Sequence, residues 1–445
     1  MDDRRPANDA TAIADLPIDP ATPLWKVPSF RLLFITRVAS TTAFQMVGVI
    51  VGWHVYELTN SALHLGLIGL AQFLPQFFLM LPAGQIADRL NRRTVLWWCY
   101  GLAFFSAAGL MWAAAQDRPS LAAIYALVAV NMVARTFEQP VMQALLPVMA
   151  PRAVLHRAIA AHISARQAAV LIGPMLGGVL YYFGPVFDYG VCAVLALAAA
   201  VCAFLLPNPG RPAKKMELSW DSVSLGFRFI WRRETLLGAM LMEFMSSLFG
   251  SVTALLPLYA RVILEVGAWG AGALRSAAAL GGLLAAAVLT RMPIKSDGGF
   301  WLLTSFALVG AATFAFGFST SMVLSILALM LVGVGDLVAT VIRQTLIQMQ
   351  TPNEMRGRVF SVNSLFYGTS SQIGQFRAGL TAEWFGAVAA VAIGGAALVG
   401  AVVMFAWLFP GLRRVDNPAL VGQVDPMGDQ RVGEKSLGDQ RQPRS

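Results

Sequence analysis

The sequence predicts an all-α integral membrane protein with twelve transmembrane helices in two pseudo-symmetric six-helix halves. Three observations predict this fold class. Of the 445 residues, 57% are hydrophobic and only 13% are charged, whereas soluble domains carry about 25% charged residues. Apolar stretches of about 20 residues, long enough to cross a bilayer as helices, recur along the whole chain. The chain also repeats itself at a constant offset of 201 residues.

Twelve apolar runs are the predicted spans. The first six are roughly 30–56, 63–86, 94–115, 121–146, 158–183 and 186–206. The second six are roughly 236–260, 269–289, 300–318, 322–347, 359–384 and 387–409. Several runs are longer than a bilayer requires, so we expect tilted helices.

The segments around these runs predict the domain organisation. The N-terminal tail lacks the apolar core of a signal peptide, and the C-terminal tail is polar and charged, which is typical of disorder. The predicted units are a cytoplasmic tail (1–29), a first six-helix half (30–206), a cytoplasmic linker (207–235), a second six-helix half (236–410) and a cytoplasmic tail (411–445).

The linker contains a predicted amphipathic helix. One helical face carries Trp220, Val223, Phe227, Ile230 and Trp231, and the opposite face carries Arg228, Arg232 and Arg233. Such a helix is expected to lie on the cytoplasmic membrane surface.

Basic residues predict the orientation. If both termini are cytoplasmic, the outside loops hold only Arg118 and Arg261 as basic residues. Because positively charged loops resist translocation, we expect both termini in the cytoplasm. The basic residues on the inside are Arg89, Arg92, Arg93, Arg152, Arg157, Arg211, Lys214, Lys215, Arg228, Arg232, Arg233, Arg291, Lys295, Arg356 and Arg358. This bias also explains the net charge of +9 without nucleic acid as a partner.

The repeat relates the two halves. Glycine and turn positions of the first half recur 201 residues later, as expected of a transporter built from parallel repeats. The matched pairs are Gly66 and Gly267, Gly69 and Gly270, Gln143 and Gln344, Pro151 and Pro352, Arg157 and Arg358, Gly173 and Gly374, and Gly178 and Gly379.

The turn between the second and third spans reads "GQIADRLNRR" over residues 84–93. It resembles the loop signature of the major facilitator superfamily. Asn91 replaces the usual glycine, and since asparagine tolerates the left-handed conformation, the turn is expected to survive. The resemblance implies that Gly84, Asp88, Arg89, Arg92 and Arg93 form a cytoplasmic latch between the halves. The alternative is that these arginines act only as topology signals.

Two further motifs resemble the same family. Arg135 and Gln139 match its Arg-x-x-x-Gln motif in span four. In span five, Gly173, Pro174, Gly177 and Gly178 resemble the core of its antiporter motif, which is associated with export. The proline removes a backbone hydrogen bond and the glycines allow close helix contact. Close packing at any membrane helix interface is the alternative.

Residues 65–89 and 352–386 carry a more specific likeness. They resemble the enterobactin-exporter-like, or transmembrane secretion effector, branch of the superfamily. Macrolide efflux proteins share much of the same pattern.

Ionisable residues within spans are candidates for proton and charge coupling, since an unpaired charge there is costly. Glu138 lies one turn from Arg135 and is either a counter-ion for Arg92 or a proton carrier. Glu243 and Asp336 have no cation one turn away on their own helices. We expect one of them, preferentially Asp336, to carry the proton.

Asp336 occupies the repeat position of Arg135, so the two are predicted to face each other across a central cavity. A fixed Asp336–Arg135 bridge is the alternative for this pair. For Asp336 and Glu243, a salt bridge to Arg275 or Arg377 on another helix is also open.

Polar side chains at helical spacing predict a substrate cavity. In span eleven they fall on one face, and in spans one and two they lie one turn apart. The predicted cavity residues are Arg37, Thr41, Gln45, Gln72, Gln76, Asn363, Tyr367, Ser371 and Arg377. Helix–helix packing through these polar residues is the competing interpretation.

These features predict a secondary active exporter and proton antiporter. It would move a siderophore or drug-like molecule across the bacterial inner membrane as a monomer, by alternating access. The sequence has no phosphate-binding nucleotide loop, and its four histidines show no metal-ligand spacing. We therefore expect no enzymatic activity, no cofactor and no metal; the partners are the substrate, protons and the lipid bilayer. An uptake symporter for a metabolite and a non-transporting receptor or scaffold are the alternatives.

Overall fold

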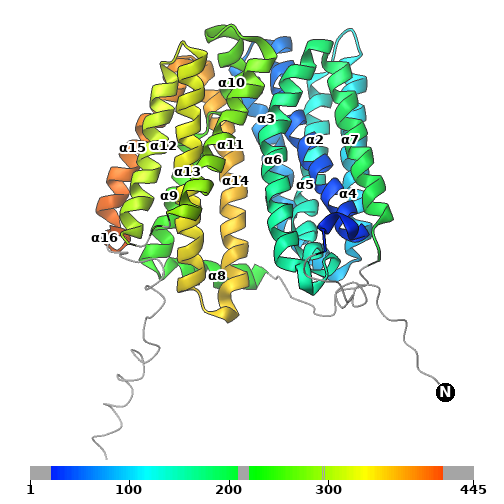
Figure 1. The fold of residues 1–445 in the computed structure, drawn as a ribbon. Helices are drawn as coiled ribbons and strands as arrows, with labels where there is room; N and C mark the ends of the chain where they lie inside the picture. Colours follow the sequence, from blue (N-terminus) through cyan, green and yellow to red (C-terminus); the bar gives the residue numbers. More distant parts are fainter. Residues whose placement is uncertain (1–21, 209–219, 293, 295, 414–445) are drawn as a thin grey trace, which may run out of the picture.

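The computed structural model describes residues 22–208, 220–292, 294 and 296–413, and they form two helical bundles side by side (Figure 1). The first bundle contains six long helices. They are α2 (Pro28–Thr59), α3 (Ala62–Arg89), α4 (Arg92–Ala114), α5 (Leu121–Met149), α6 (Leu155–Leu180) and α7 (Pro185–Leu205). Each coincides with one of the first six predicted spans.

The second bundle contains the other six spans. They are α9 (Glu234–Gly250), α11 (Gly267–Arg291), α12 (Gly298–Gly317), α13 (Met322–Gln350), α14 (Asn353–Phe385) and α15 (Ala387–Leu408). The span of α9 continues through the short helix α10 (Leu256–Leu258) to Ile263. The predicted fold class is therefore confirmed: an all-α protein of two six-helix halves.

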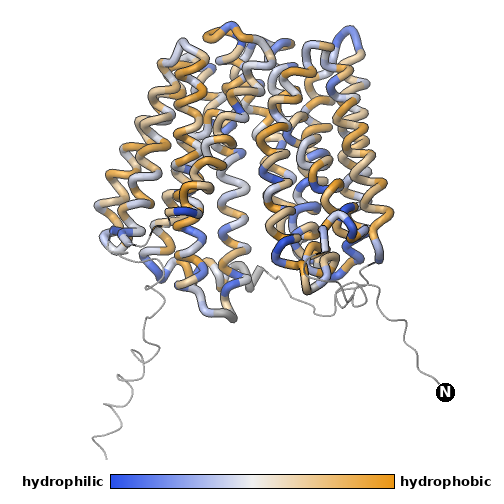
Figure 2. Tube along the Cα trace, viewed as in Figure 1, coloured by the Kyte–Doolittle hydropathy of each residue, from blue (hydrophilic) through white to orange (hydrophobic). Residues whose placement is uncertain are grey.

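Among the described residues, eleven helices are long and apolar enough to cross a membrane, and α14 is the predicted span outside that set. Its polar residues explain the difference. Figure 2 shows it as a pale helix in the middle of the molecule. Because α14 packs against α3, α9 and the linker helix α8 (Trp220–Trp231), protein rather than lipid surrounds much of it.

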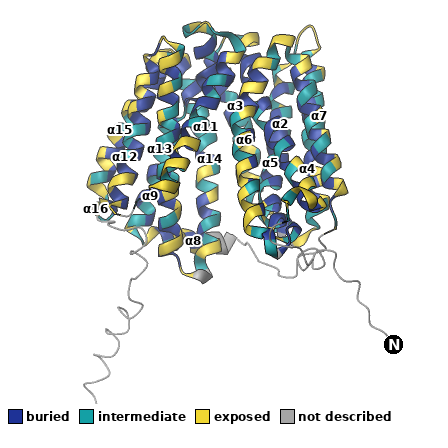
Figure 3. Cartoon of the chain, viewed as in Figure 1, coloured by how far each residue is buried: buried dark blue, intermediate teal, exposed yellow. Residues whose placement is uncertain are grey.

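The outward sides of the helices are apolar. Phe105, Trp112 and Trp407 are 69%, 65% and 81% exposed, and exposed residues line the outside of both bundles in Figure 3. Large exposed apolar side chains are unfavourable in water but suit contact with lipid. The described chain is thus a multi-pass membrane protein.

The two halves contact each other at one end, which we call the closed end. It lies opposite the end that carries Leu24–Lys26 and the short helix α16 (Pro410–Arg413), called the terminal end (Figure 1). A Cβ atom added to Gly379 of α14 would lie 2.5 Å from Gly66 Cα of α3. The backbones of α3 and α14 can approach this closely only because both residues are glycines.

A second extensive contact between the halves joins α6 and α11. A Cβ atom on Gly178 of α6 would lie 2.6 Å from the carbonyl oxygen of Ala268, and Ser276 of α11 donates a hydrogen bond to the carbonyl oxygen of Leu171 (2.7 Å). Helices α3, α14, α6 and α11 therefore line the boundary between the halves.

The linker helix α8 packs on α14 through Gly226, where a Cβ atom would lie 2.8 Å from the carbonyl oxygen of Arg358. Ile230 of α8 is buried, whereas Trp231 is 62% exposed. The predicted tails before residue 22 and after residue 413, linker residues 209–219, and the side chains of Trp220 and Val223 lie outside the described residues. The predicted membrane-surface position of α8 stays a prediction.

Candidate functional site

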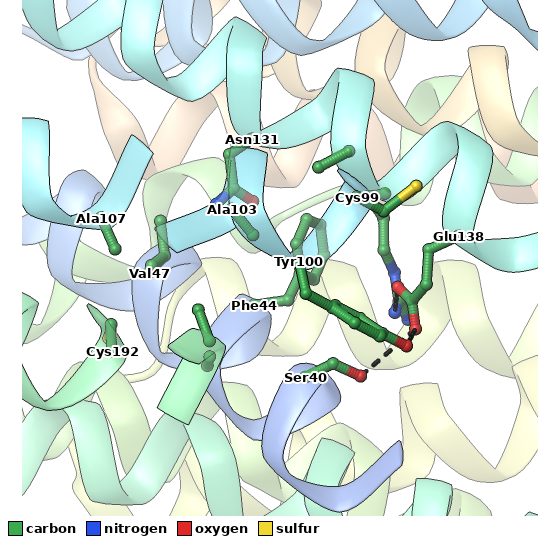
Figure 4. A pocket seen from close by; sticks show the side chains of 14 residues that line it. Ser40, Phe44, Val47, Cys99, Tyr100, Ala103, Ala107, Asn131, Glu138 and Cys192 are labelled. Atoms are coloured by element: carbon green, nitrogen blue, oxygen red, sulfur yellow. Dashed lines mark hydrogen bonds and ion pairs between the residues drawn. The ribbon is translucent and has the colours of Figure 1, made fainter. Parts of the chain in front are cut away.

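A buried cluster in the first half is organised around the Glu138 carboxylate of α5. Its Oε1 accepts hydrogen bonds from Arg37 (3.2 Å), Ser40 (3.2 Å) and Tyr100 (3.3 Å). Arg135, one turn away, donates to Oε2, and its guanidinium lies 4.9 Å from the Phe44 ring. Figure 4 shows the side chains of Ser40, Tyr100 and Glu138 meeting.

This arrangement ties one carboxylate to two cations and two hydroxyl groups. Arg37 and Glu138 are both almost fully buried. A buried charge pair persists when further hydrogen bonds satisfy its remaining polar atoms. Next to the cluster lies a cavity of about 30 Å³ between α2, α4, α5 and α7.

Glu138 binds cations other than Arg92, the one that the counter-ion interpretation assigned to it. Glu138 binds Arg37 and Arg135, whereas Arg92 donates to the carbonyl oxygens of Ala144 (3.0 Å) and Ala87 (3.5 Å). The Arg135 guanidinium is engaged on its own helix, and no ion pair between Arg135 and Asp336 occurs within the described chain. The alternative of a fixed Asp336–Arg135 bridge is therefore not observed among the described residues, and the placement of the two charges across a central cavity stays a prediction.

A second charged cluster lies in the second half, around Arg343 of α13. Its guanidinium donates a hydrogen bond to Asn363 of α14 and approaches Glu243 of α9, with 3.4 Å between Nε and Oε2. This ion contact lacks hydrogen-bond geometry, because neither of the two atoms has a hydrogen-bond partner among the described residues. Asp336, two turns before Arg343, lies within electrostatic range of Arg343 and Glu243.

Two cross-helix salt bridges left open by the sequence are replaced by other contacts. The partner of Glu243 is Arg343 rather than Arg275 or Arg377. Arg377 instead donates to the carbonyl oxygens of Leu248 (2.8 Å) and Phe249 (3.1 Å) at the last turn of α9. A cation at a helix C-terminus satisfies carbonyl groups that have no partner within the helix.

Tyr367 shows that the space between the halves is accessible at the level of the Arg343 cluster. Its ring centre lies 5.9 Å from the guanidinium carbon of Arg343 in its own half. It is also within electrostatic range of Arg166 of α6 in the other half, yet 47% of the tyrosine is exposed. Asp336, which lies within electrostatic range of Tyr367, is exposed as well. We use the name central cavity for the exposed part of the boundary between the halves next to Asp336, Tyr367 and Arg166.

The remaining predicted cavity residues lie on α2, α3 and α14. Thr41 is fully buried, and its hydroxyl has no hydrogen-bond partner among the described residues. Gln76 approaches Gly368 across the halves, where an added Cβ atom would collide with its Nε2. Gln45, Gln72 and Ser371 are half-buried. The predicted polar residues are thus not gathered in one place: Arg37 lies in the buried cluster of the first half, whereas Gln76 lies at the boundary between the halves.

The antiporter-like motif lies between both halves. Gly173 and Gly177 pack on α2, where Cβ atoms would lie 2.8 Å from Gln45 Cβ and 3.1 Å from Met46 Cα. Pro174 and Gly178 pack on α11 of the other half, where a Cβ atom built on Gly272 would collide with the carbonyl oxygen of Pro174. These residues allow α6 to fit between two helices that belong to different halves.

The loop signature contains the N-cap residue of α4, a role that was not predicted from the sequence. The turn survives with Asn91, as expected, but for another reason: Asn91 is extended (φ −64°) and caps α4, accepting a hydrogen bond from the Arg93 backbone nitrogen (3.0 Å). Asparagine is a preferred N-cap because its side-chain oxygen satisfies a free helix N–H. The left-handed conformation is not what lets asparagine replace glycine here.

The other signature residues stay within the first half in their described contacts. Arg93 lies 5.1 Å from the Phe204 ring, Arg89 is exposed and Gly84 is half-buried. The side chain of Asp88 lies outside the described residues, so its role in a latch stays a prediction.

Sequence reasoning gave no role to Arg166 and Arg343, and it considered Arg275 only as a salt-bridge partner of Glu243 or Asp336. Their position inside predicted spans marked them as unusual. Their partners depend on helices far away in the chain, which hydropathy and spacing do not reveal.

Comparison with known proteins identifies relatives across most of the chain. The sequence profile of the Major Facilitator Superfamily matches residues 33–371. The enterobactin exporter EntS of Citrobacter koseri is 26% identical over 401 residues, which are 90% of this chain and 96% of that protein. An enterobactin exporter EntS of Escherichia coli is 27% identical over 333 residues, which are 75% of this chain and 80% of that protein.

Solved structures share the fold at low identity. A POT family transporter in complex with a thioalcohol-conjugated peptide has a TM-score of 0.70 at 12% identity, covering 86% of this chain and 96% of its own. The nucleoside transporter NupG has a TM-score of 0.65 at 14% identity, covering 86% and 99%.

Proposed function

The chain belongs to the major facilitator superfamily, and from this premise we propose that it is a proton-driven exporter of a small organic molecule. The profile match confirms the superfamily expected from the loop signature, and the relatives confirm the resemblance to the enterobactin-exporter-like branch. The chain is a multi-pass membrane transporter. The direction of transport, the coupling ion and the mechanism are our proposal.

One observation carries the proposal of proton coupling: two carboxylates share a single arginine. Glu243 Oε2 lies 3.4 Å from Arg343 Nε, and Asp336, two turns earlier on the same helix as Arg343, lies within electrostatic range of this arginine. With both carboxylates ionised, this cluster carries one uncompensated negative charge. Two neighbouring carboxylates resist simultaneous ionisation, and an uncompensated charge within a membrane is costly. Binding of one proton makes the cluster neutral.

The accessibility of its carboxylate to water favours Asp336, rather than Glu243, as the group that exchanges the proton. Asp336 is exposed, whereas Glu243 is 3% exposed. A carboxylate that contacts water in the central cavity can exchange protons with whichever side of the membrane the cavity faces. Glu243 then keeps Arg343 in place when Asp336 is neutral.

Glu138 is the weaker candidate for the proton carrier. It accepts hydrogen bonds from four side chains, two of them cationic, so protonation would remove the charge that holds Arg37 and Arg135. We propose that Glu138 stabilises the first half.

The contacts at the closed end support the proposal of alternating access. Glu383 of α14 accepts hydrogen bonds from the Ser61 hydroxyl (2.9 Å) and the Leu63 backbone nitrogen (3.0 Å) at the start of α3. A residue of the second half thus caps a helix of the first half, and Ser61 provides no side-chain cap of its own. We propose that this cap breaks each time the closed end opens.

Removing the cap should favour opening. Because a helix cap contributes about 1 kcal/mol, Glu383→Ala is expected to increase about fivefold the fraction of molecules in which the closed end is open. The measurement is the labelling rate of Ala62→Cys by a membrane-impermeant maleimide, with Cys99, Cys192 and Cys202 replaced. Ala62 is 5% exposed, so labelling requires opening.

Glu57→Ala is the matched control for this experiment. Glu57 lies at the same end, but its hydrogen bond goes to Tyr181 of its own half (2.7 Å). It should leave the labelling rate unchanged. Equal rates for wild type and Glu383→Ala would contradict the cap.

The siderophore class of the substrate rests on the relatives named enterobactin exporters, and a drug-like molecule is the second class. We propose the bacterial inner membrane as the location, both termini in the cytoplasm, a monomeric protein, and the 84–93 loop as a cytoplasmic latch. The domain boundaries from the sequence belong to the same proposal. The antiporter-like motif favours export over the alternative of an uptake symporter.

Transport direction is tested with enterobactin in membrane vesicles. Inside-out vesicles whose lumen is acidified should accumulate enterobactin when they contain the protein, and collapse of the pH gradient should abolish accumulation. Right-side-out vesicles should not accumulate it. Gradient-driven accumulation in right-side-out vesicles would instead identify an uptake symporter.

A further inference from the structure

Arg275 of α11 reaches across the boundary between the halves. Its guanidinium lies against Gly48 of α2, where an added Cβ atom would be 2.9 Å from both Nη1 and Nη2. Any larger residue at position 48 would occupy part of this space. The second half therefore places a cation directly on the backbone of a helix of the first half.

The same arginine lines a cavity of about 30 Å³ built from both halves. Helices α2 and α3 contribute Gly48, Gly52 and Ile68, and the second half contributes Pro257, Arg275 and Gln375. Apart from Arg275, Gln375 and Thr253, the residues that line it are apolar. The volume has room for about two water molecules, which is the size of an oxyanion group.

Arg275 differs from the paired arginines inside the spans. Arg37 and Arg135 bind Glu138, Arg343 approaches Glu243, and Arg377 binds carbonyl oxygens. Within the described ranges, Arg275 has no hydrogen bond, no ion pair and no neighbouring charge that acts on it. An unpaired cation within a span is costly, so a counter-ion from outside the protein would stabilise it.

We propose that Arg275 binds an anionic oxygen group, such as a carboxylate, of the transported molecule in this cavity. A guanidinium presents two parallel N–H groups to both oxygens of a carboxylate. The cavity has room for the oxyanion group alone, so the rest of the molecule would lie outside it, and Gln375 supplies an amide for a further hydrogen bond to the bound group. The substrate class is therefore an organic anion. This inference rests on the proposed transport function.

Arg166 is the other cation that could bind such a group. It lies in the central cavity near Arg135 and Tyr367, and the described residues offer it no hydrogen bond or ion pair. It lines neither of the two cavities of about 30 Å³. Arg275, by contrast, lies in a cavity shaped by a glycine of the opposite half.

The test measures binding to the purified full-length protein in detergent, without any ion gradient. Salicylate and salicylamide share a ring and a hydroxyl group and differ in a charged carboxylate against a neutral amide. Their half-saturating concentrations are read from the thermal unfolding midpoint. Because charge-assisted hydrogen bonds are the stronger ones, wild type should bind salicylate at least about tenfold more tightly.

Three variants test whether the preference for salicylate over salicylamide depends on Arg275. Arg275→Gln should reduce salicylate affinity to that of salicylamide, and Arg275→Lys should restore part of the difference. Gly48→Ala keeps the charge but displaces the guanidinium, so it should also weaken the preference. Arg291→Gln, as a control, removes an exposed arginine from the end of the same helix and should leave the preference intact.

Equal binding of the two probes by wild type would overturn the proposal. So would a wild-type preference in Arg275→Gln, or a preference lost in Arg166→Gln and kept in Arg275→Gln. If Arg275→Gln does not fold, Arg275→Lys and Gly48→Ala decide: a wild-type preference in both overturns the proposal. Binding without a gradient separates this test from the transport proposal, because a protein that exports by another mechanism would still show the anion preference.

Discussion

Asp336→Asn is expected to retain substrate exchange and to lose export driven by a pH gradient. Asparagine resembles the protonated acid, so the cluster of Arg343, Glu243 and residue 336 stays neutral throughout the cycle. No proton then moves with the substrate. One pH unit is equivalent to about 1.4 kcal/mol, or about a tenfold concentration ratio per proton exchanged, and the variant should lose that accumulation.

The measurement uses proteoliposomes with enterobactin on both sides. Exchange at equal pH should continue at a rate similar to wild type, whereas a pH gradient should produce no net accumulation. Asp297→Asn is the matched control, because Asp297 is an exposed aspartate at the start of α12 outside the cluster. Undiminished gradient-driven export by Asp336→Asn would exclude Asp336 and make Glu243 the candidate.

Glu138→Gln is expected to destabilise the protein more than the equivalent amide substitution at Glu243 or Asp336. It would leave Arg37 and Arg135 buried without their shared counter-ion. Removing one partner of a buried ion pair costs about 3–5 kcal/mol. The thermal unfolding midpoint of the purified protein should fall markedly, together with the yield of monodisperse protein.

Two variants calibrate this result. Glu265→Gln changes an exposed glutamate before α11 and should leave the unfolding midpoint unchanged. Glu243→Gln should lower the unfolding midpoint by an intermediate amount. In this variant Arg343 would still lie near the Asp336 carboxylate and would still donate a hydrogen bond to Asn363. A Glu138→Gln protein as stable as wild type would show that the carboxylate does not hold the first half together.

The helices were predictable because their signals are local. Length and apolarity of a segment determine whether it spans a membrane, so each of the twelve predicted runs coincides with a helix. The Arg135–Glu138 contact is local too, since residues three apart lie on the same helical face. Asn91 shows the limit of local reasoning: its tolerance of the left-handed conformation was real, but its capping ability decided its conformation.

Pairing between distant helices was decided only by the tertiary structure. Arg37 and Glu138 are 101 residues apart, and Arg343 and Glu243 are 100 residues apart. The helical period places a charge on one face of its own helix but does not say which face of another helix meets it. Arg275 is the strongest case, because its surroundings are set by Gly48, more than 200 residues earlier, and by the absence of a described acidic group beside it. By itself, the sequence determined the spans, their repeat and the family signature; packing decided which charges are neutralised and which are left to bind a ligand.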